Sequence, residues 1–186
     1  MITLQVPGAP PGLQVAGIRH AAGATRAHAR VRIRALLRAL GASMFALDAG
    51  SVEIASAPGA APRMLLDGRP ADAGISISHE GAWSFCALCR GAAVGLDIMC
   101  VGLEDDWRQV AHDYLGPAEA GAIARAPAAA RPRAFCLAWT AREAYLKSCA
   151  LALSEWTPVE GDAAFFPFDG PPGHVGAIVL LGAAQG

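Results

Sequence analysis

The chain has 186 residues, a net charge of −1 and 54% hydrophobic residues, so it is long enough to bury a real core as one domain or two small ones. It has no apolar run as long as a membrane span, and its first residues lack the basic and apolar regions of a secretory signal, so we expect neither membrane contact nor export. The five cysteines are odd in number and irregularly spaced. This speaks against a disulfide framework or a zinc site and predicts a reducing, cytoplasmic compartment.

The N-terminal part of the chain is basic. Residues 1–47 contain six arginines and no acidic residue. Within this part, apolar residues at helical spacing predict a helix over residues 27–42, with Gly41 as its stop. Four arginines repeat at every fourth position along another side of that helix: Arg26, Arg30, Arg34 and Arg38. Such a lobe suits a phosphate-rich ligand or an acidic partner.

The arginine repeat of this helix also has simpler explanations. It is compatible with an ordinary solvated face. An organelle transit segment is also Arg-rich and acid-poor, but it should be separable from the fold, whereas this helix carries a continuous apolar stripe. A nucleic-acid binder would combine the arginines with aromatic residues or a known motif, and neither accompanies them. We therefore expect no nucleic-acid partner.

The middle of the chain predicts a β-hairpin. Residues 75–79 alternate apolar and polar side chains, a turn follows at Glu80-Gly81, and residues 82–88 return. Cys86 and Cys89 lie three positions apart in the returning strand, so they should face opposite sides of it.

Further elements are predicted with simpler patterns. We expect strands at residues 2–6, 52–55, 93–99, 163–168 and 174–181, and a turn at Gly68-Arg69-Pro70. Helical segments are expected over residues 103–115, from residues 116–119 onward, and over residues 133–151. The last residues are small and are expected to fray.

The last of these helices carries charges on or beside its apolar face. At 3.6 residues per turn, Phe135, Trp139, Leu146 and Cys149 gather on one side. Arg142 falls in the middle of that side, with Glu143 and Lys147 one turn apart at its edge. The pair also fits an ordinary solvated i,i+4 pair. However, Lys147 is the only lysine beside 14 arginines. An ammonium suits a proton donor or a contact to one phosphate oxygen.

Two further polar residues stand out within strands. Asp97 lies inside an apolar strand, where a carboxylate is costly to bury unless a metal or another cation neutralises it. His79 lies at a strand end, where a capping or core imidazole is the simpler explanation.

These stretches resemble one family. The long helix resembles the W-x-x-K-E-A-x-x-K signature of the Sfp-type 4′-phosphopantetheinyl transferase superfamily at Trp139, Arg142, Glu143, Ala144 and Lys147. Arg142 stands where that family usually has Lys. Three shorter stretches are similar to the family's G-K-P, S-x-S-H and G-[IV]-D-[IV]-E segments: residues 68–70, 76–79 and 95–99. Met99 takes the place of the final Glu. The resemblance runs from about residue 26 to residue 153.

The resemblance implies an α+β fold with a pseudo-two-fold arrangement. Each half would be a small antiparallel sheet packed on a long helix, with the active site in the cleft between them. The N-terminal half, residues 1–91, would bind the nucleotide of coenzyme A. The C-terminal half, residues 92–186, would hold a metal site and the signature helix. A chain with both halves needs no partner to complete its cleft, so we expect a monomer.

The family transfers the phosphopantetheine arm of coenzyme A to a serine of an acyl- or peptidyl-carrier protein, releasing adenosine 3′,5′-bisphosphate. The resemblance implies Glu143 as the base and Lys147 as the group that stabilises the leaving phosphate. It implies coenzyme A contacts from five residues: Arg30, Arg69, Ser78, His79 and Arg142. Fatty acid, polyketide and nonribosomal peptide pathways remain open.

The resemblance also implies a magnesium site, in which Asp97 and Glu143 would be the ligands. Met99 removes a further acidic ligand, since a thioether binds hard cations poorly. Glu104 in the following loop is a candidate replacement. The alternative is a catalytically weak or inactive module of the same fold that binds coenzyme A or a carrier protein.

Overall fold

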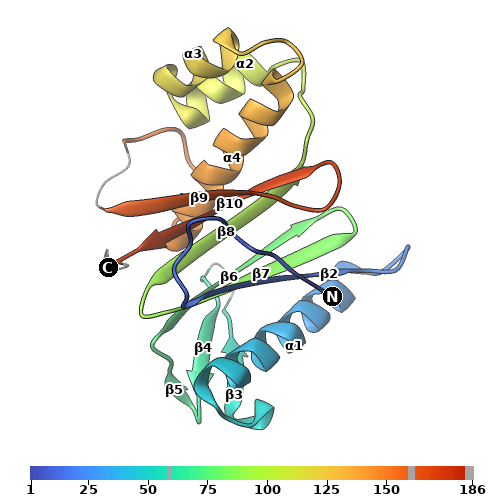
Figure 1. Cartoon of the computed structure of the whole chain (residues 1–186), viewed down its shortest axis with the longest axis vertical. Coiled ribbons are helices and arrows are strands. Elements are labelled where there is room, and N and C mark those ends of the chain that lie inside the picture. The colour runs from blue at the N-terminus through green and yellow to red at the C-terminus, as the bar shows by residue number, and fades with distance from the viewer. Residues whose placement is uncertain (58–59, 159–161, 183–186) are drawn as a thin grey trace.

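A computed structural model describes residues 1–57, 60–158 and 162–182 (Figure 1). The N-terminal elements are β1 (Ile2–Thr3), β2 (Leu13–Arg19), α1 (Arg26–Phe45), η1 (Ala49–Ser51), β3 (Val52–Ala55), β4 (Arg63–Leu66), β5 (Arg69–Pro70), β6 (Ala73–Glu80) and β7 (Trp83–Arg90). The C-terminal elements are β8 (Ala93–Cys100), α2 (Trp107–Val110), η2 (Ala111–Leu115), α3 (Pro117–Arg125), α4 (Arg131–Ser148), β9 (Ala163–Asp169) and β10 (His174–Leu181).

Three antiparallel sheets make up the β structure. The first has the order β1-β2-β7-β6, the second β8-β10-β9, and a small third sheet β3-β4-β5. The first two sheets share one apolar core, to which they contribute Val15, Phe85, Ala87, Val94, Leu96, Ile178 and Leu180 among others. The edge strands of these two sheets, β6 and β8, lie beside each other.

Each of the two larger sheets carries one long helix on its other face. Helix α1 packs on the first sheet and on the small sheet through Ile33 and Leu37, both of which are fully buried. Helix α4 packs on β8 and β10, and Ala144 and Leu146 are buried there. The helices therefore lie outside a pair of packed sheets, as Figure 1 shows. The alternation of apolar residues along β7 and β8 supplies the shared core between them.

The predicted class, a mixed fold of helices and antiparallel sheets, is confirmed. The pseudo-two-fold relation of two halves stays a prediction, as does the division at residues 91 and 92. No described helix is long and apolar enough to cross a membrane.

Most of the predicted elements are confirmed. The strand at residues 52–55 is β3, the hairpin is β6 and β7, and the last three predicted strands are β8, β9 and β10. Cys86 and Cys89 do face opposite sides of β7, because Cys86 packs in the core under α1 and Cys89 in the core between the sheets. Burial raises the pKa of the Cys86 thiol to about 12.

Several boundaries are wrong. The first strand covers only Ile2–Thr3, and β2 was not predicted at all. Helix α1 runs past Gly41 to Phe45, because Gly41 is a packing position: a Cβ there would lie 2.6 Å from the terminal carbon of Met64.

The C-terminal helices also differ from the predicted ranges. Helix α4 begins at Arg131 and ends at Ser148, three residues before the predicted end. Helical structure in the region of residues 103–115 begins only at Trp107. The expected fraying of the last residues falls on 183–186, which lie outside the described residues.

Candidate functional site

Close packing of α4 against β8 builds the centre of the site. Gly95 faces α4, and a Cβ at that position would clash with the backbone oxygen of Ala144. Only glycine therefore allows the helix to come this near to the strand. Side chains alternate along a strand, so Asp97, two residues on, faces α4 as well. The next helical turn after Ala144 brings Lys147 to this carboxylate.

Lys147 connects the two acidic residues predicted for the site. Its Nζ lies 2.6 Å from Asp97 Oδ1 and 3.6 Å from Glu143 Oε2. It also donates to the backbone oxygen of Leu96 at 3.2 Å. Asp97 is 6% exposed, whereas the side chains of Lys147 and Glu143 keep 31% and 28% of their surface. The solvated-pair explanation therefore does not describe this lysine, whose shortest contact is to a buried carboxylate on another element.

Glu143 is in an environment that favours its protonated form. Burial raises its pKa, and the charge of the nearby Asp97 raises it further. The ammonium of Lys147 and a hydrogen bond from Trp139, one turn earlier on α4, act in the opposite direction but do not offset the rise. Two carboxylates share one ammonium here, so the cluster has an excess of negative charge. Such a cluster can accept a proton or a further cation.

Polar side chains of β6 join the two sheets beside this cluster. Ser76 Oγ accepts from the Leu96 amide at 3.0 Å, and Ser78 Oγ donates to Asp97 Oδ1 at 2.8 Å. Glu80 Oε1 accepts from the Cys100 amide at 3.2 Å. These residues alternate along β6, so all three side chains point towards β8. Ser78 is 4% exposed and its hydroxyl orients the Asp97 carboxylate.

Arg142 is buried, and its guanidinium bonds to backbone carbonyls. It donates to the oxygen of Glu155 at 3.1 Å and to that of Thr157 at 3.3 Å. The segment that it holds also presses the ring of Trp156 against Gly116, where a Cβ would lie 2.5 Å from the ring. In this structure Arg142 therefore fixes the segment after α4.

A trough runs from Lys147 along β6 to the start of α1. We use this name for three adjoining cavities that share walls. The first, of about 300 Å³, is lined by Lys147, Ile77 and Pro62, among others. The second, of about 480 Å³, shares Ile77 and Pro62 and adds Arg30 and Arg34 of α1. Positive charge from α1 thus lies along the trough that begins at Lys147.

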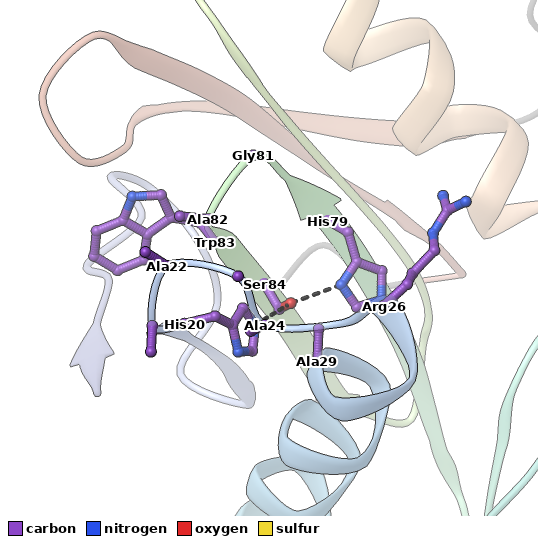
Figure 2. A pocket seen from close by; sticks show the side chains of 12 residues that line it. His20, Ala22, Ala24, Arg26, Ala29, His79, Gly81, Ala82, Trp83 and Ser84 are labelled. Carbon is purple, nitrogen blue, oxygen red and sulfur yellow. Dashed lines mark hydrogen bonds between the residues drawn. The ribbon is translucent and has the colours of Figure 1, made fainter.

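His79 marks the far part of the trough. It lines both the second cavity and the third, which has a volume of about 430 Å³ and lies at the N-terminus of α1. In Figure 2, His79 lies between Ser84 and the side chain of Arg26. Burial lowers the pKa of His79, and the charges of Arg26 and Arg30 lower it further. The positive end of the α1 dipole also favours an anion at this place.

The remaining predicted residues lie apart from the cluster. Arg69 is exposed in β5 of the small sheet and is not among the residues lining the trough. Met99 packs against an apolar cluster that contains Trp107 and Phe135. Glu104 is exposed in the loop before α2. Within the described ranges, no three His, Cys, Asp or Glu side chains come together as a metal-binding group, so Glu104 does not complete one with Asp97 and Glu143.

The comparison with protein families fits this geometry. The model of the 4′-phosphopantetheinyl transferase superfamily matches residues 93–184, which include Asp97, Glu143 and Lys147. The predicted resemblance to this superfamily is confirmed over these residues. The match supports a transferase of the phosphopantetheinyl transferase kind. No curated protein matches the chain with significant similarity.

Three residues at the site were not predicted. Ser84 and His20 form a hydrogen-bonded group with His79, and Ser76 bonds to β8. Ser84 does carry a sequence signal, since it is the only hydroxyl in the apolar run from Trp83 to Leu88. His20 had no such signal, because β2 itself was not recognised.

Proposed function

We propose that this protein transfers the 4′-phosphopantetheine arm of coenzyme A to a serine of an acyl- or peptidyl-carrier protein and releases adenosine 3′,5′-bisphosphate. One observation carries the proposal: Lys147, bonded to Asp97 and beside Glu143, stands at one end of a trough lined by arginines of α1. Separated cationic side chains can bind the pyrophosphate and the nucleotide phosphate of coenzyme A. The transfer step needs a base for the serine hydroxyl and a cation for the departing phosphate, which Glu143 and Lys147 can supply.

The nucleotide end of coenzyme A would lie on the α1 side of the trough. Arg30 and His79 line it there, and Arg34 is held in place by a hydrogen bond to Ser56 at 2.6 Å. Arg30 is exposed, so its guanidinium is free to meet phosphate oxygens. Arg69, Ser78 and Arg142 were also predicted as coenzyme A contacts. We propose that Ser78 and Arg142 act instead by positioning Asp97 and the segment after α4.

Glu143 and Lys147 would perform the proton and charge steps. The carrier serine oxygen forms a bond to the phosphorus that bears the pantetheine arm, and the bond from that phosphorus to the bridging pyrophosphate oxygen breaks. Glu143 takes the serine proton, and its raised pKa makes it a stronger base than an ordinary carboxylate. Lys147 donates a hydrogen bond to the departing phosphate of adenosine 3′,5′-bisphosphate.

The residues present fit a magnesium ion that arrives with the pyrophosphate. Asp97 and Glu143 offer hard carboxylate oxygens, and their charge exceeds that of the single ammonium between them. Magnesium is commonly held by one or two carboxylates together with substrate phosphates and water. When bound, it would neutralise the pyrophosphate and polarise its phosphorus.

A second candidate is a module that binds coenzyme A or a carrier protein with weak or no transfer. It is favoured by Met99, whose side chain lies in an apolar cluster where the family has an acid. It is also favoured by the short Lys147–Asp97 bond, which already satisfies one metal-ligand oxygen. Binding of coenzyme A without turnover would support this candidate.

The first experiment is mass spectrometry of an apo-carrier protein incubated with this protein, coenzyme A and magnesium. Transfer predicts a mass gain of one phosphopantetheine arm, lost with EDTA and absent from a carrier whose acceptor serine is changed to alanine. Acyl carriers of fatty acid and polyketide synthesis and peptidyl carriers of nonribosomal synthesis would be tested side by side. The absence of any gain, with coenzyme A still raising the melting temperature, selects the second candidate. Size exclusion of the same sample tests the expected monomer.

A further inference from the structure

Three polar side chains form a row across the end of the first sheet. His20 follows β2, Ser84 lies in β7, and His79 is its pairing partner in β6. Ser84 Oγ is 2.7 Å from His20 Nε2 and 2.6 Å from His79 Nδ1, and Figure 2 shows both bonds. Ser84 is fully buried, so solvent does not compete for its hydroxyl.

The hydroxyl has one proton for two imidazoles. It can donate to only one of them, so the other imidazole must donate an N–H to the Ser84 oxygen if both bonds are made. Either His20 donates and His79 Nδ1 accepts, or the order is reversed. In the first arrangement a neutral His79 carries its proton on Nε2, and in the second on Nδ1.

The buried Nδ1 of His20 decides between the two. This atom has no hydrogen-bond partner among the described residues, and His20 is 8% exposed. In the second arrangement Nδ1 would be a buried N–H without an acceptor, which is rarer and costlier than an unused lone pair. Burial lowers the pKa of His20, and the charges of Arg32 and His28 lower it further. The positive charge of these two neighbours also favours a lone pair at Nδ1 over an N–H. The first arrangement is therefore the stable one.

The surroundings of His79 keep its ring neutral. Burial lowers its pKa, and the cationic groups around it, Arg26, Arg30, His20 and Lys147, act in the same direction. His79 lines two cavities of the trough, and its Nδ1 is already bonded to Ser84. Nε2 is the nitrogen left for a ligand.

We propose that His20 and Ser84 are positioning residues that hold His79 as the neutral Nε2–H tautomer, so that His79 presents a fixed hydrogen-bond donor to an anionic oxygen in the trough. The identity of that anion, a phosphate of coenzyme A, rests on the proposed function; the tautomer does not. A fixed neutral donor complements Arg26 and Arg30, because it adds direction without adding a further repelling charge.

The test uses two substitutions of His20, which does not bond to His79. In His20→Leu the Ser84 oxygen loses its donor and can accept from His79 Nδ1–H, so the tautomers of His79 should mix. In His20→Gln the amide N–H₂ lies near the position of Nε2 and can donate in its place, so the wild-type tautomer should persist. Nitrogen-15 chemical shifts of the labelled full-length chain report the protonated nitrogen of each ring. Ser84→Ala removes the partner directly and should also mix the tautomers.

The outcomes separate this proposal from the proposed function. A wild-type His79 with its proton on Nδ1, or a tautomer unchanged in both His20→Leu and Ser84→Ala, would overturn the proposal. Titration with coenzyme A is a separate readout: His20→Leu should bind about 3- to 10-fold more weakly than His20→Gln, the loss expected for one hydrogen bond. If the tautomer is as expected but coenzyme A does not bind the wild-type chain, the positioning role of His20 and Ser84 stands and the proposed ligand is wrong.

Discussion

The two long helices differ in how they use their charges. On α1, Arg26, Arg30 and Arg38 are exposed, and the helix has no acidic residue at all. On α4, Arg142 is buried against carbonyls, and Lys147 and Glu143 meet each other and Asp97. These charged groups of α4 thus have partners within the protein, whereas the three exposed arginines of α1 are open to a partner from outside. The comparison suggests that α1 supplies binding and α4 supplies chemistry and internal order.

The largest expected effect lies on α4. Replacing Glu143 by glutamine removes the proposed base while keeping its size, so the rate of transfer should fall by about 10²- to 10⁴-fold, the usual contribution of a general base. Steady-state transfer to a carrier protein measures this. The control is Glu104→Gln, which changes an exposed acid outside the cluster and should leave the rate unchanged. Full activity of Glu143→Gln would disprove its role as base and metal ligand.

The next largest effect is expected at Arg142, the buried cation of α4, and concerns the free energy of unfolding. Arg142→Ala leaves the carbonyls of Glu155 and Thr157 without their donor, and should lower the free energy of unfolding by about 1–3 kcal/mol. Urea denaturation measures the change. Arg133 is the matched control: it lies on the same helix but makes an exposed ion pair with Asp169, so Arg133→Ala should cost less than about 1 kcal/mol. Equal losses in the two variants would contradict the internal role of Arg142.

A smaller effect is expected on α1. Arg30→Ala should raise the KM for coenzyme A by about 5- to 10-fold with little change in kcat, because it removes a charge-assisted contact made equally to substrate and transition state. Arg38 lies two turns further along the same row but not among the residues that line the trough, so Arg38→Ala is its control. The difference between the two should shrink as salt is added. A fall in kcat alone would place Arg30 in the chemistry.

Much of the fold followed from local patterns, and the exceptions have physical causes. The hairpin of β6 and β7 was predictable because alternation and a Glu-Gly turn are local signals. Strand β2 was missed because Gly17 interrupts its apolar run; the glycine is needed because the ring of Phe85, on the neighbouring strand, fills the place of a side chain. The predicted end of α1 was wrong for a similar reason. Gly41 does not end the helix; a glycine is needed there because the side chain of Met64 packs against it.

The candidate site was predictable in its residue types but not in its contacts. Asp97, Glu143 and Lys147 were recognisable from one strand and one helix, and they do meet. Ser78 was expected on coenzyme A, but its hydroxyl bonds to Asp97. That contact depends on β6 lying beside β8, which no pattern within either strand reveals. The hydrogen-bond partner of a polar side chain in a strand depends on which other strand the fold places beside it.

The smallest effect concerns the free energy of unfolding, which the partly buried, ionised Glu143 of α4 lowers at neutral pH. Its pKa in the folded protein is raised above the ordinary value of 4.5, so the folded state holds the proton more tightly than the unfolded state. Its contribution to stability is therefore fully present below about 4.5 and is lost as the pH rises through the raised pKa. Glu143→Gln cannot ionise, and should melt at a higher temperature than the wild type at neutral pH, with the difference vanishing under acid conditions. Melting curves across that range measure it, with Glu104→Gln as the control. A variant that melts lower than the wild type at neutral pH would show instead that Lys147 and Trp139 stabilise the charged Glu143 by more than burial and Asp97 oppose it.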